Sequence, residues 1–415
     1  MSEKYSDKHH LMLLSVALLY FTANSLGLPH GLLYTTLLTP VFYYWLVHHF
    51  HVRVVVPFAV TMTPFFIVHA LVGVSWFNYA LSTGLLFCTL VFALIVHFEL
   101  KQYDFTLWLF SRLTLWNAAL TAVAVIIYFT PWVEWMWTFR DLTITIKDYP
   151  RLQLFTYEPS YYSTLLVPLV LFFAVRLMVN AGRWTNNFAH LLLLLISLLL
   201  SFSLGVISSL VLAITVFGIA NRHRMARFPA MNRFYTFITA SGMLSLFLLL
   251  VLWPDNPIFN RIADLFSGKD TSGMGRTYEA ILLAWKIAAE KSLLFGVGPG
   301  QIKIVGEPII RAYYNYGLDT VPVVRIPNTV GETLATFGLL GVLFRFGVEI
   351  WLFAKTRVHE NTFRLMMFTY IFIYQFTGSF LTNIAEYVIW VIAFTPCCTY
   401  LDFNTSKSQK NTVSV

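Results

Sequence analysis

The chain is dominated by apolar runs of about the length that a helix needs to cross a bilayer. A transmembrane helix takes roughly 20 apolar residues, and we count about twelve segments of this kind. Only helices and closed barrels satisfy their backbone groups inside lipid. The sequence therefore predicts an all-α polytopic membrane protein with about twelve transmembrane helices. They lie near 11–28, 31–48, 54–76, 79–98, 105–129, 160–181, 187–202, 204–221, 234–254, 330–354, 363–381 and 384–401.

The composition supports this class and disfavours others. Hydrophobic residues make up 58% of the chain and charged residues only 12%, whereas about a quarter of the residues of a soluble protein are charged. The formal net charge is +8, but the basic residues are dispersed in short polar gaps, so we expect no nucleic acid partner. Cys88, Cys397 and Cys398 lie in apolar runs and predict neither a metal site nor disulfides.

The distribution of Lys and Arg predicts the orientation. The short gaps on one side of the membrane carry basic residues and those on the other side carry none, so both termini are predicted to be cytoplasmic. Two long loops then face outward, at 131–159 and 255–328. We expect one integral membrane domain over 1–415, ending in a disordered cytoplasmic tail at 402–415.

The second long loop is unusually basic for an outer loop. It holds eight of the 28 Lys and Arg residues, on the side where positive charge is normally scarce. Arg276 begins a helical pattern, where its charge is unfavourable beside the helix dipole unless an anion binds there. The alternative is that Arg276 extends to lipid headgroups. The eight are Arg261, Lys269, Arg276, Lys286, Lys291, Lys303, Arg311 and Arg325.

Residues 276–295 are predicted to form an amphipathic helix along the membrane surface. The glycine-rich run Gly296 to Gly300 follows it, which is a good helix stop and also suits an anion-binding nest around Gly298. The predicted apolar face consists of Tyr278, Ile281, Leu282, Trp285 and Ala288.

The first long loop ends in charged and aromatic residues directly before the sixth apolar run. Pro159 suits the first turn of that helix, which places Glu158 at its N-terminus, where a carboxylate is favoured. Capping is therefore one role for Glu158 and catalysis is the other. The aromatic residues suit stacking on sugar rings, although such residues also form the interfacial belt. They include Trp132, Trp135, Tyr157 and Tyr161.

Metal and triad chemistry have little support. Of the eleven histidines, only His30 is predicted in an outer gap, and neither outer loop contains an Asp-x-Asp cluster. We therefore expect no metal site and no Ser-His-Asp triad.

Five short motifs occur in order along the chain. They are Y-E-P-S before the sixth span, S-F-S-L-G at 201–205, S-G-M-G-R at 272–276, G-V-G-P-G at 296–300, and I-P-N-T-V-G-E-T-L-A-T-F-G-L-L-G at 326–341. Together they resemble the O-antigen ligase and Wzy-type polysaccharide polymerase superfamily of bacterial inner membranes. The resemblance covers roughly 150 to 341 and depends on the combination, since each motif is weak alone.

The resemblance implies a C-type glycosyltransferase-like membrane fold that acts on undecaprenyl-diphosphate-linked glycans without a metal or cofactor. By motif position, Arg151 and Arg276 are the arginines that hold the diphosphate. Ligases of the family usually carry His-Asn where this chain has Pro327-Asn328. This departure favours a polymerase, and Y-E-P-S is similar to what exopolysaccharide polymerases carry.

We therefore expect a polysaccharide polymerase in the bacterial inner membrane, with lipid-linked donor and acceptor glycans, membrane lipids and a chain-length regulator as partners. The alternatives are a ligase acting on lipid A core, and a transporter or flippase, which would need ionisable residues along several spans. Arg112 and Arg345 alone lie clearly within spans. The expected catalytic residues are Glu158 as base, Arg151 and Arg276. The expected substrate-binding residues are Arg311, Arg325, Tyr157, Tyr161, Gly298, Asn328 and Glu332, the last being the second candidate base.

Overall fold

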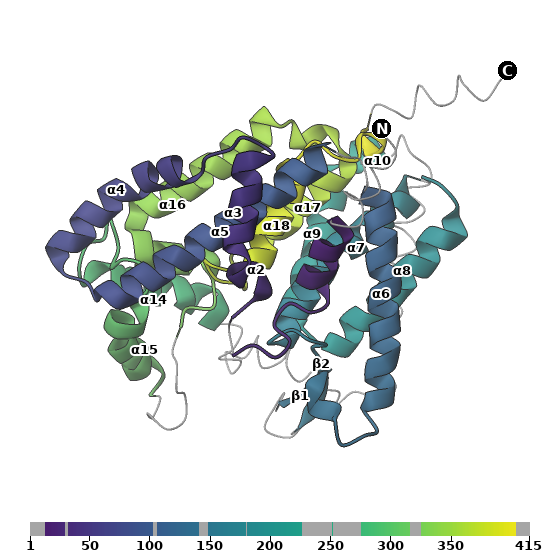
Figure 1. Cartoon of the computed structure of the whole chain (residues 1–415), viewed down its shortest axis with the longest axis horizontal. Coiled ribbons are helices and arrows are strands. Elements are labelled where there is room, and N and C mark those ends of the chain that lie inside the picture. The colour runs from purple at the N-terminus through teal and green to yellow at the C-terminus, as the bar shows by residue number, and fades with distance from the viewer. Residues whose placement is uncertain are drawn as a thin grey trace.

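The computed structural model describes most of the chain as a helical molecule (Figure 1). The described residues are 13–29, 32–102, 106–140, 148–179, 181–225, 251, 275–315 and 325–403. The predicted span at 234–254 and the predicted tail thus lie almost entirely outside them. The assignment of 1–415 to a single domain stays a prediction.

The elements follow one another as helices with one short pair of strands between them. A helix over 13–21 precedes them. The longer helices are α3 (Thr39–His48), α4 (Val55–Val72), α5 (Trp76–Gln102), α6 (Thr106–Ile127), α7 (Pro159–Met178), α8 (Trp184–Ser201), α9 (Leu204–Ala220), α14 (Tyr278–Ala289), α15 (Glu307–Tyr314), α16 (Thr329–Lys355), α17 (Thr362–Tyr374) and α18 (Ile384–Phe394). The short elements are α2 (Tyr34–Leu37), η1 (Val133–Trp135), β1 (Trp137–Arg140), β2 (Tyr149–Leu152), α10 (Arg222–Met225), η2 (Ile302–Gly306), η3 (Val358–Glu360) and η4 (Thr399–Leu401).

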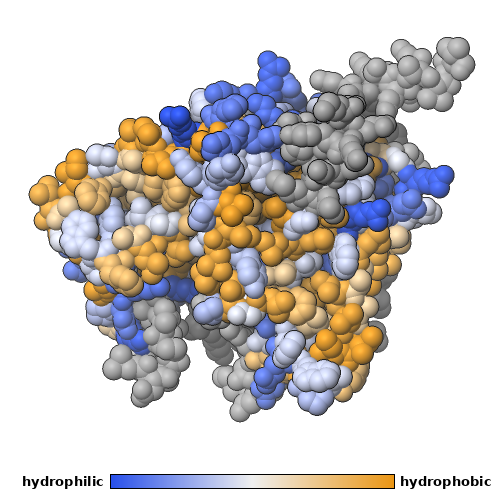
Figure 2. Space-filling view, in the orientation of Figure 1, coloured by the Kyte–Doolittle hydropathy of each residue, from blue (hydrophilic) through white to orange (hydrophobic). Residues whose placement is uncertain are grey.

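The described residues support a membrane protein without confirming twelve spans. Six helices (α4 to α8 and α16) are long and apolar enough to cross a membrane, and α9, α17 and α18 are shorter apolar helices. Hydrophobic side chains cover the middle of the face seen in Figure 2, with hydrophilic ones above and below. The predicted helical hairpin at 187–221 is confirmed, because α8 and α9 are separated by only Phe202 and Ser203.

Helix α7 is enclosed by protein along its whole length. It packs against α8, α9, α17 and α18, and all but one of its residues are buried. A helix that is apolar all round is expected to be buried, and here the first turns add hydroxyl groups that bind neighbouring helices. Ser163 contacts Ser201 Oγ at 2.7 Å, and Thr164 contacts the Tyr374 hydroxyl at 3.2 Å. Such a centre can hold a site rigidly.

Helix α16 is broken in the middle, which the sequence prediction of one span at 330–354 missed. Gly338 has φ +66° and ψ −163°, a conformation that only glycine adopts readily. The break removes the bonds that the amides of 339 and 340 would make to the carbonyls of 335 and 336. All four groups are satisfied by one inserted segment, residues 293–298.

The inserted segment replaces the lost helical hydrogen bonds with backbone hydrogen bonds between residues 293–298 and residues 335–340. Amides 297 and 298 donate to carbonyls 335 and 336, each at 2.9 Å, and amides 339 and 340 donate to carbonyls 293 and 294 at 3.0 and 3.1 Å. A Cβ on Gly296 would lie 2.4 Å from the carbonyl carbon of Thr336, and one on Gly338 would lie 2.3 Å from that of Leu294. The glycine-rich run therefore serves close backbone packing.

Helix α14 is shorter than predicted, and the face that it buries differs from the predicted apolar face. It ends at Ala289, and its buried face is made of Ala280, Leu283, Ala284, Ile287 and Ala288, which pack against α16. The predicted apolar face shares only Ala288 with this buried face, and Tyr278 and Trp285 are 70% and 46% exposed. Small residues at a helix interface let the backbones approach closely, so the alanines and not the aromatics face the neighbour.

The first long loop contains a hairpin, which the expectation of an all-α protein missed. Strands β1 and β2 pair antiparallel, with Thr138 opposite Arg151. The hairpin lies at the same end of the molecule as α14 and α15, at the bottom of Figure 1. We call this end the outer end, following the predicted orientation.

Candidate functional site

The turn between α8 and α9 brings the two predicted diphosphate arginines together. Arg151 Nε donates to the carbonyl of Ser201 at 3.2 Å. The Arg276 guanidinium lies beside Gly205, where a Cβ would come within 3.1 Å of Nη1. Two arginines that are far apart in sequence therefore lie at the two ends of residues 201–205, around the α8–α9 turn.

The hairpin positions Arg151. Leu152 beside it is fully buried, and the indole Nε1 of Trp137 donates to the carbonyl of Ala124 at 2.8 Å, which fastens β1 to α6. Tyr149 packs against Phe202 in the turn, with ring centroids 4.8 Å apart. Arg151 thus extends from a fixed strand toward the turn.

The side chain of Asn328 positions Arg276 from the other direction. Its Nδ2 donates to the carbonyls of Arg276 and Phe376 at 2.7 and 2.6 Å, and its Oδ1 accepts from the amide of Gly331 at 2.8 Å as the N-cap of α16. Asn328 is fully buried and both its donors and its acceptor are engaged. It was expected to bind substrate, whereas its contacts give it a positioning role.

The electrostatics of the turn favour an anion. Helix α9 begins at Leu204 with its N-terminus at this turn, and a helix N-terminus carries a partial positive charge. Two guanidinium groups beside it add positive charge at a place where positive charge is unfavourable. An anion with several oxygens removes this conflict, and arginines bind such anions in a forked geometry.

Glu158 lies at the start of α7 and does not cap it. Its backbone has the extended conformation of an N-cap residue, but the side chain makes no capping bond. Its Oε1 accepts from Ser160 Oγ at 2.6 Å. Glu158 and Arg276 both lie close enough to the Tyr374 phenol to interact with it electrostatically. The carboxylate predicted as base and Arg276 therefore lie within electrostatic range of the same phenol.

Tyr157 forms the wall beside Glu158. Its ring stacks obliquely on Tyr161 with centroids 4.8 Å apart. Burial raises the pKa of the Tyr157 phenol well above its usual range, and the charge of Glu158 adds to this effect. The phenol therefore keeps its proton. Tyr161 is 2% exposed and accepts from Asn24 Nδ2 at 3.3 Å, so it supports Tyr157 from behind and has no face open to a substrate.

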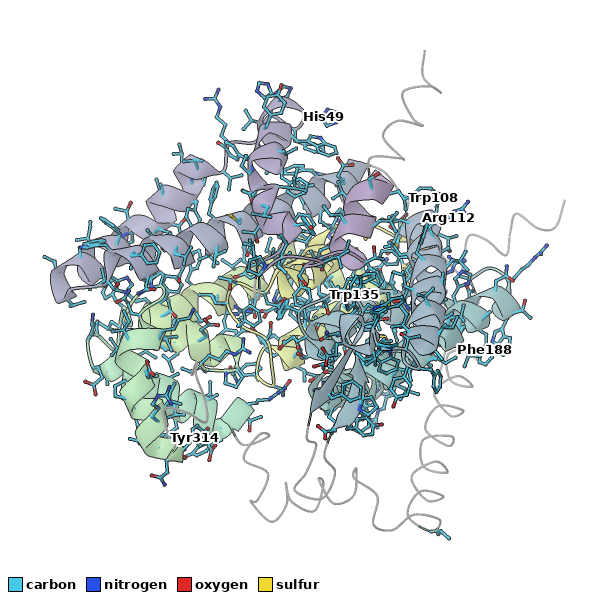
Figure 3. The ribbon with its side chains drawn as sticks, turned by 60° about the horizontal axis from the view of Figure 1, so that its bottom comes forward. His49, Trp108, Arg112, Trp135, Phe188 and Tyr314 are labelled. Carbon is cyan, nitrogen blue, oxygen red and sulfur yellow. The ribbon has the colours of Figure 1, made fainter. Side chains whose placement is uncertain are left out.

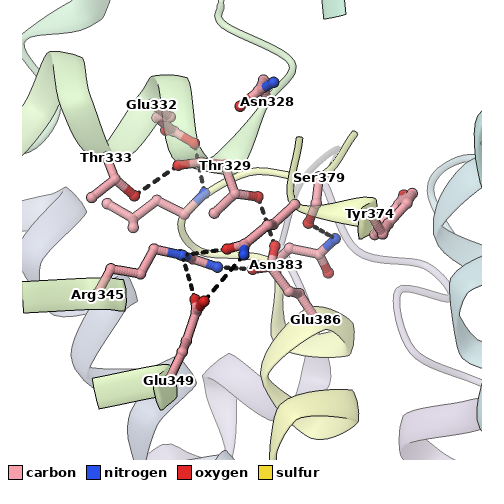
Figure 4. A network of polar contacts seen from close by, with 12 residues as sticks. Asn328, Thr329, Glu332, Thr333, Arg345, Glu349, Tyr374, Ser379, Asn383 and Glu386 are labelled. Carbon is pink, nitrogen blue, oxygen red and sulfur yellow. Dashed lines mark hydrogen bonds and ion pairs between the residues drawn. The ribbon is translucent and has the colours of Figure 1, made fainter. Parts of the chain in front are cut away.

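Glu332 approaches from the first turn of α16. Its Oε2 accepts from the amide of Leu381 at 2.6 Å, which holds the segment between α17 and α18 (Figure 4). Glu332 also interacts electrostatically with Arg325, as Tyr157 does. Arg325 is exposed, and its charge acts on one group beside α7 and on one group of α16.

Two predicted binding residues are engaged in other contacts. Arg311 Nε pairs with Glu307 Oε1 at 2.8 Å, one turn earlier on α15. Gly298 is buried, its amide donates to Thr336, and a Cβ there would lie 3.1 Å from the Tyr79 ring. At least one amide of the predicted anion-binding nest, that of Gly298, is therefore already bonded to α16.

Two cavities flank the segment from Tyr149 to Tyr157. One, of about 630 Å³, is lined almost entirely by apolar and aromatic side chains of α6, α8 and the hairpin. The other, of about 480 Å³, lies between residues 25–29, Trp135 and residues 153–157. The apolar cavity thus lies at the start of this segment, before Arg151, and the cavity with both polar and apolar lining lies at its end.

Comparison with protein families adds one match, and comparison with curated proteins found no matching relative. Residues 189–346 match the model of the O-antigen ligase family, Wzy_C. This stretch of the chain is similar to the O-antigen ligase family. The resemblance predicted from the motifs is confirmed over these residues, and the match together with the apolar helices indicates a multi-pass, O-antigen ligase-like membrane enzyme.

The O-antigen ligase match covers only part of the site. It includes the α8–α9 turn, Arg276, Asn328, Glu332 and the break in α16, whereas Arg151 and Glu158 precede it. The matched residues thus contain Arg276 and the α8–α9 turn. The hairpin and the start of α7 contribute the other arginine and the predicted base.

Sequence reasoning missed a buried ionic cluster connected to the candidate site. Arg345 Nε lies 3.0 Å from Glu349 Oε1 and donates to Gln375 Oε1 at 2.8 Å, and its Nη2 pairs with Glu386. Gln375 Nε2 donates to Glu349 Oε2 at 3.1 Å. Ionisable residues inside a membrane are expensive and usually functional. Only Arg345 was noticed in the sequence, although Glu349 follows it by one turn of the same helix; Gln375 and Glu386 lie on other elements, at the end of α17 and on α18.

This cluster reaches the start of α16 through one hydroxyl. Thr329 Oγ1 donates to Glu386 Oε2 at 2.7 Å, and Thr329 is the neighbour of Asn328. Arg345 belongs to the half of α16 beyond the break (Figure 4). Arg345, Glu386 and Thr329 therefore connect the two halves of the broken helix through α18. In the part of the chain that the structure describes, no group of three or more His, Cys, Asp or Glu residues could hold a metal ion.

Proposed function

We propose that this protein is a polysaccharide polymerase of the bacterial inner membrane. It transfers a glycan from undecaprenyl diphosphate to a hydroxyl of a second lipid-linked repeat unit at the outer face, with both termini of the chain in the cytoplasm. A chain-length regulator is a further proposed partner.

The observation that carries the proposal is the meeting of Arg151 and Arg276 at the N-terminus of α9. A diphosphate leaving group needs its developing charge stabilised more than it needs a proton. Two guanidinium groups and a helix N-terminus supply that stabilisation. Arg325 adds a more distant positive charge at the outer end.

The apolar cavity of about 630 Å³ supports a lipid-linked donor. It is lined by Tyr149 and Pro150, directly before Arg151, and by Phe202 in the turn. A polyprenyl chain lying in this cavity would place its diphosphate beside the two arginines. The apolar cavity and the two arginines thus lie side by side, as the polyprenyl chain and the diphosphate do in the proposed substrate.

In the proposed reaction, the acceptor hydroxyl oxygen forms a bond to the anomeric carbon of the donor sugar. The bond from that carbon to the diphosphate oxygen breaks, and undecaprenyl diphosphate leaves with the electron pair. The Glu158 carboxylate takes the hydroxyl proton. Ser160, which donates to Oε1, orients the carboxylate, while Asn328 holds Arg276 through its carbonyl.

A polymerase is favoured over a ligase by Pro327, which occupies the position before Asn328. The ligase mechanism that the resemblance implies depends on a histidine there. A transporter is a weaker alternative, since the buried Arg345 is paired with Glu349 and Glu386 and so gains a role in holding α16.

The test uses purified protein in lipid discs with the lipid-linked repeat unit extracted from the producing cell. Wild type should form polymer, Arg276→Ala should form none while remaining folded, and Arg276→Lys should recover only part of the rate because the forked contact is lost. Full activity of Arg276→Ala, or glycan transfer to lipid A core in place of polymer, would contradict the proposal.

A further inference from the structure

The cavity of about 480 Å³ at the outer end has no role in the reaction described above. Its lining comes from residues 25–29, from Trp135 and from residues 153–157. Its volume is typical of a ligand site. The apolar rings that line it alternate with hydroxyl, amide and backbone groups, a mixture that differs from the other cavity, which is apolar almost throughout.

The two walls of this cavity are fastened to each other. The amide and the hydroxyl of Ser25 both donate to the carbonyl of Phe155, at 3.3 and 3.1 Å. Thr156 Oγ1 donates to the carbonyls of Gln153 and Glu158 at 2.8 and 3.0 Å. The cavity is thus a constructed feature, and its wall leads directly to the backbone of Glu158.

Tyr157 is shared by the cavity and the proposed reaction site. It lines the cavity and interacts electrostatically with Glu158 and Arg325. The acceptor hydroxyl must lie at the Glu158 carboxylate, whereas the donor diphosphate lies at the α8–α9 turn. The glycan that continues from the acceptor hydroxyl is therefore the one that reaches this cavity.

Trp135 presents an open ring to the cavity. It is 67% exposed although it lines the space, and Figure 3 shows it on the face of the outer end that is turned toward the viewer. An aromatic face offers an apolar, electron-rich plane on which the C–H groups of a sugar ring pack. Polar neighbours such as Ser25 and Gln153 suit sugar hydroxyls.

We propose that this cavity is a subsite for the sugars of the acceptor, with Trp135 and Tyr157 stacking against sugar rings. The inference rests on the proposed polymerase function and names the part of the substrate that the cavity binds. The competing role for Trp135 is that of an interfacial anchor without sugar contact.

Trp132 provides a matched control. It belongs to the same short segment and is 66% exposed, but it does not line the cavity. Membrane anchoring predicts equal behaviour for the two tryptophans. Sugar binding predicts that only Trp135 affects the acceptor.

The experiment measures initial rates of wild type, Trp135→Ala, Trp135→Phe and Trp132→Ala in lipid discs, varying acceptor and donor separately. Trp135→Ala should raise the acceptor KM about tenfold and leave the donor KM unchanged. Trp135→Phe should recover most of the affinity, and Trp132→Ala should behave as wild type. As a binding readout without turnover, the oligosaccharide released from the polymer should change the tryptophan fluorescence of wild type and not that of Trp135→Phe.

Equal acceptor KM values for Trp135→Ala, Trp132→Ala and wild type would overturn the subsite, as would equal losses in both alanine variants. These outcomes differ from a failure of the proposed function. In that case wild type forms no polymer, or Arg276→Ala forms as much as wild type. A polymerase that depends on Arg276 and ignores Trp135 keeps its function and loses only the subsite.

Discussion

Helices α7 and α16 both bring a glutamate to the outer end, but they are built in opposite ways. Helix α7 is continuous and enclosed by the large hydrophobic core. Helix α16 is broken at Gly338, and its first half packs with α14 against a much smaller core. Glu158 therefore stands on a rigid helix, and Glu332 stands on a short half-helix held by polar contacts.

The difference separates two ways of holding a site in a membrane. On the α7 side, the helix is enclosed by buried apolar side chains over nearly its whole length. On the α16 side, Asn328, Thr329 and Glu332 each bond to another segment. Irregular backbone at membrane depth is tolerated only where protein satisfies it. In thermal stability, although not in catalysis, the α16 side should therefore respond to conservative polar substitutions that the α7 side tolerates.

The largest expected effect falls on Glu158. Because Gln cannot accept the hydroxyl proton, Glu158→Gln should lower kcat by about 100-fold or more, with donor binding and thermal stability unchanged. Glu332→Gln should have a smaller effect, since its Oε2 accepts from a backbone amide and an amide oxygen can do the same. Rates with purified donor decide between them. Near-normal turnover of Glu158→Gln would move the base to Glu332.

The second effect concerns the break in α16. Gly338→Ala combines a positive φ with a Cβ only 2.3 Å from backbone, so it should cost about 3 kcal/mol or more in stability. Gly347→Ala lies on the same helix, where a Cβ would meet nothing within 4 Å. It should be neutral or slightly stabilising, because Ala favours helix. Melting temperatures in detergent measure both, and equal values would show that the inserted segment is dispensable.

The third effect separates the two carboxylates of the buried cluster. Glu386→Gln and Glu349→Gln each leave Arg345 with one carboxylate, so they match in charge, but only Glu386 also binds Thr329. Glu386→Gln should lower kcat about tenfold by loosening the start of α16, and Glu349→Gln should stay near wild type in kcat. Both should lower the melting temperature by similar amounts. Equal rate losses would reduce the cluster to a structural role.

Local patterns in the sequence predicted part of this architecture. The separation of α8 from α9 at Ser201 to Ser203 followed from length alone, and the start of α7 followed from Pro159. The family followed from motifs around these helices. These features depend on residues that are close in sequence, where propensity and hydropathy carry the signal.

The features that were missed depend on distant contacts. In the sequence, Gly338 looks like an ordinary glycine inside a helix. Its role is visible only in the structure, where residues 293–298 form hydrogen bonds with the backbone groups on either side of it. In the sequence, Arg345 looks like an isolated charge within an apolar run. In the structure, Glu386 and Gln375 lie beside it and bind it. The buried face of α14 is set by how closely alanines let α16 approach, which hydropathy does not report.

The smallest expected effect falls on Arg325, which interacts with Tyr157 on the α7 side and with Glu332 on the α16 side. Because Arg325 is exposed, water and salt screen its charge. Arg325→Gln should therefore raise the donor KM by only about threefold, and the difference from wild type should disappear at high salt. Lys286→Gln removes the same charge from an exposed position on α14 and should change nothing. A loss as large as that of Arg276→Ala would place Arg325 in direct contact with the diphosphate and would make the two sides one rigid site.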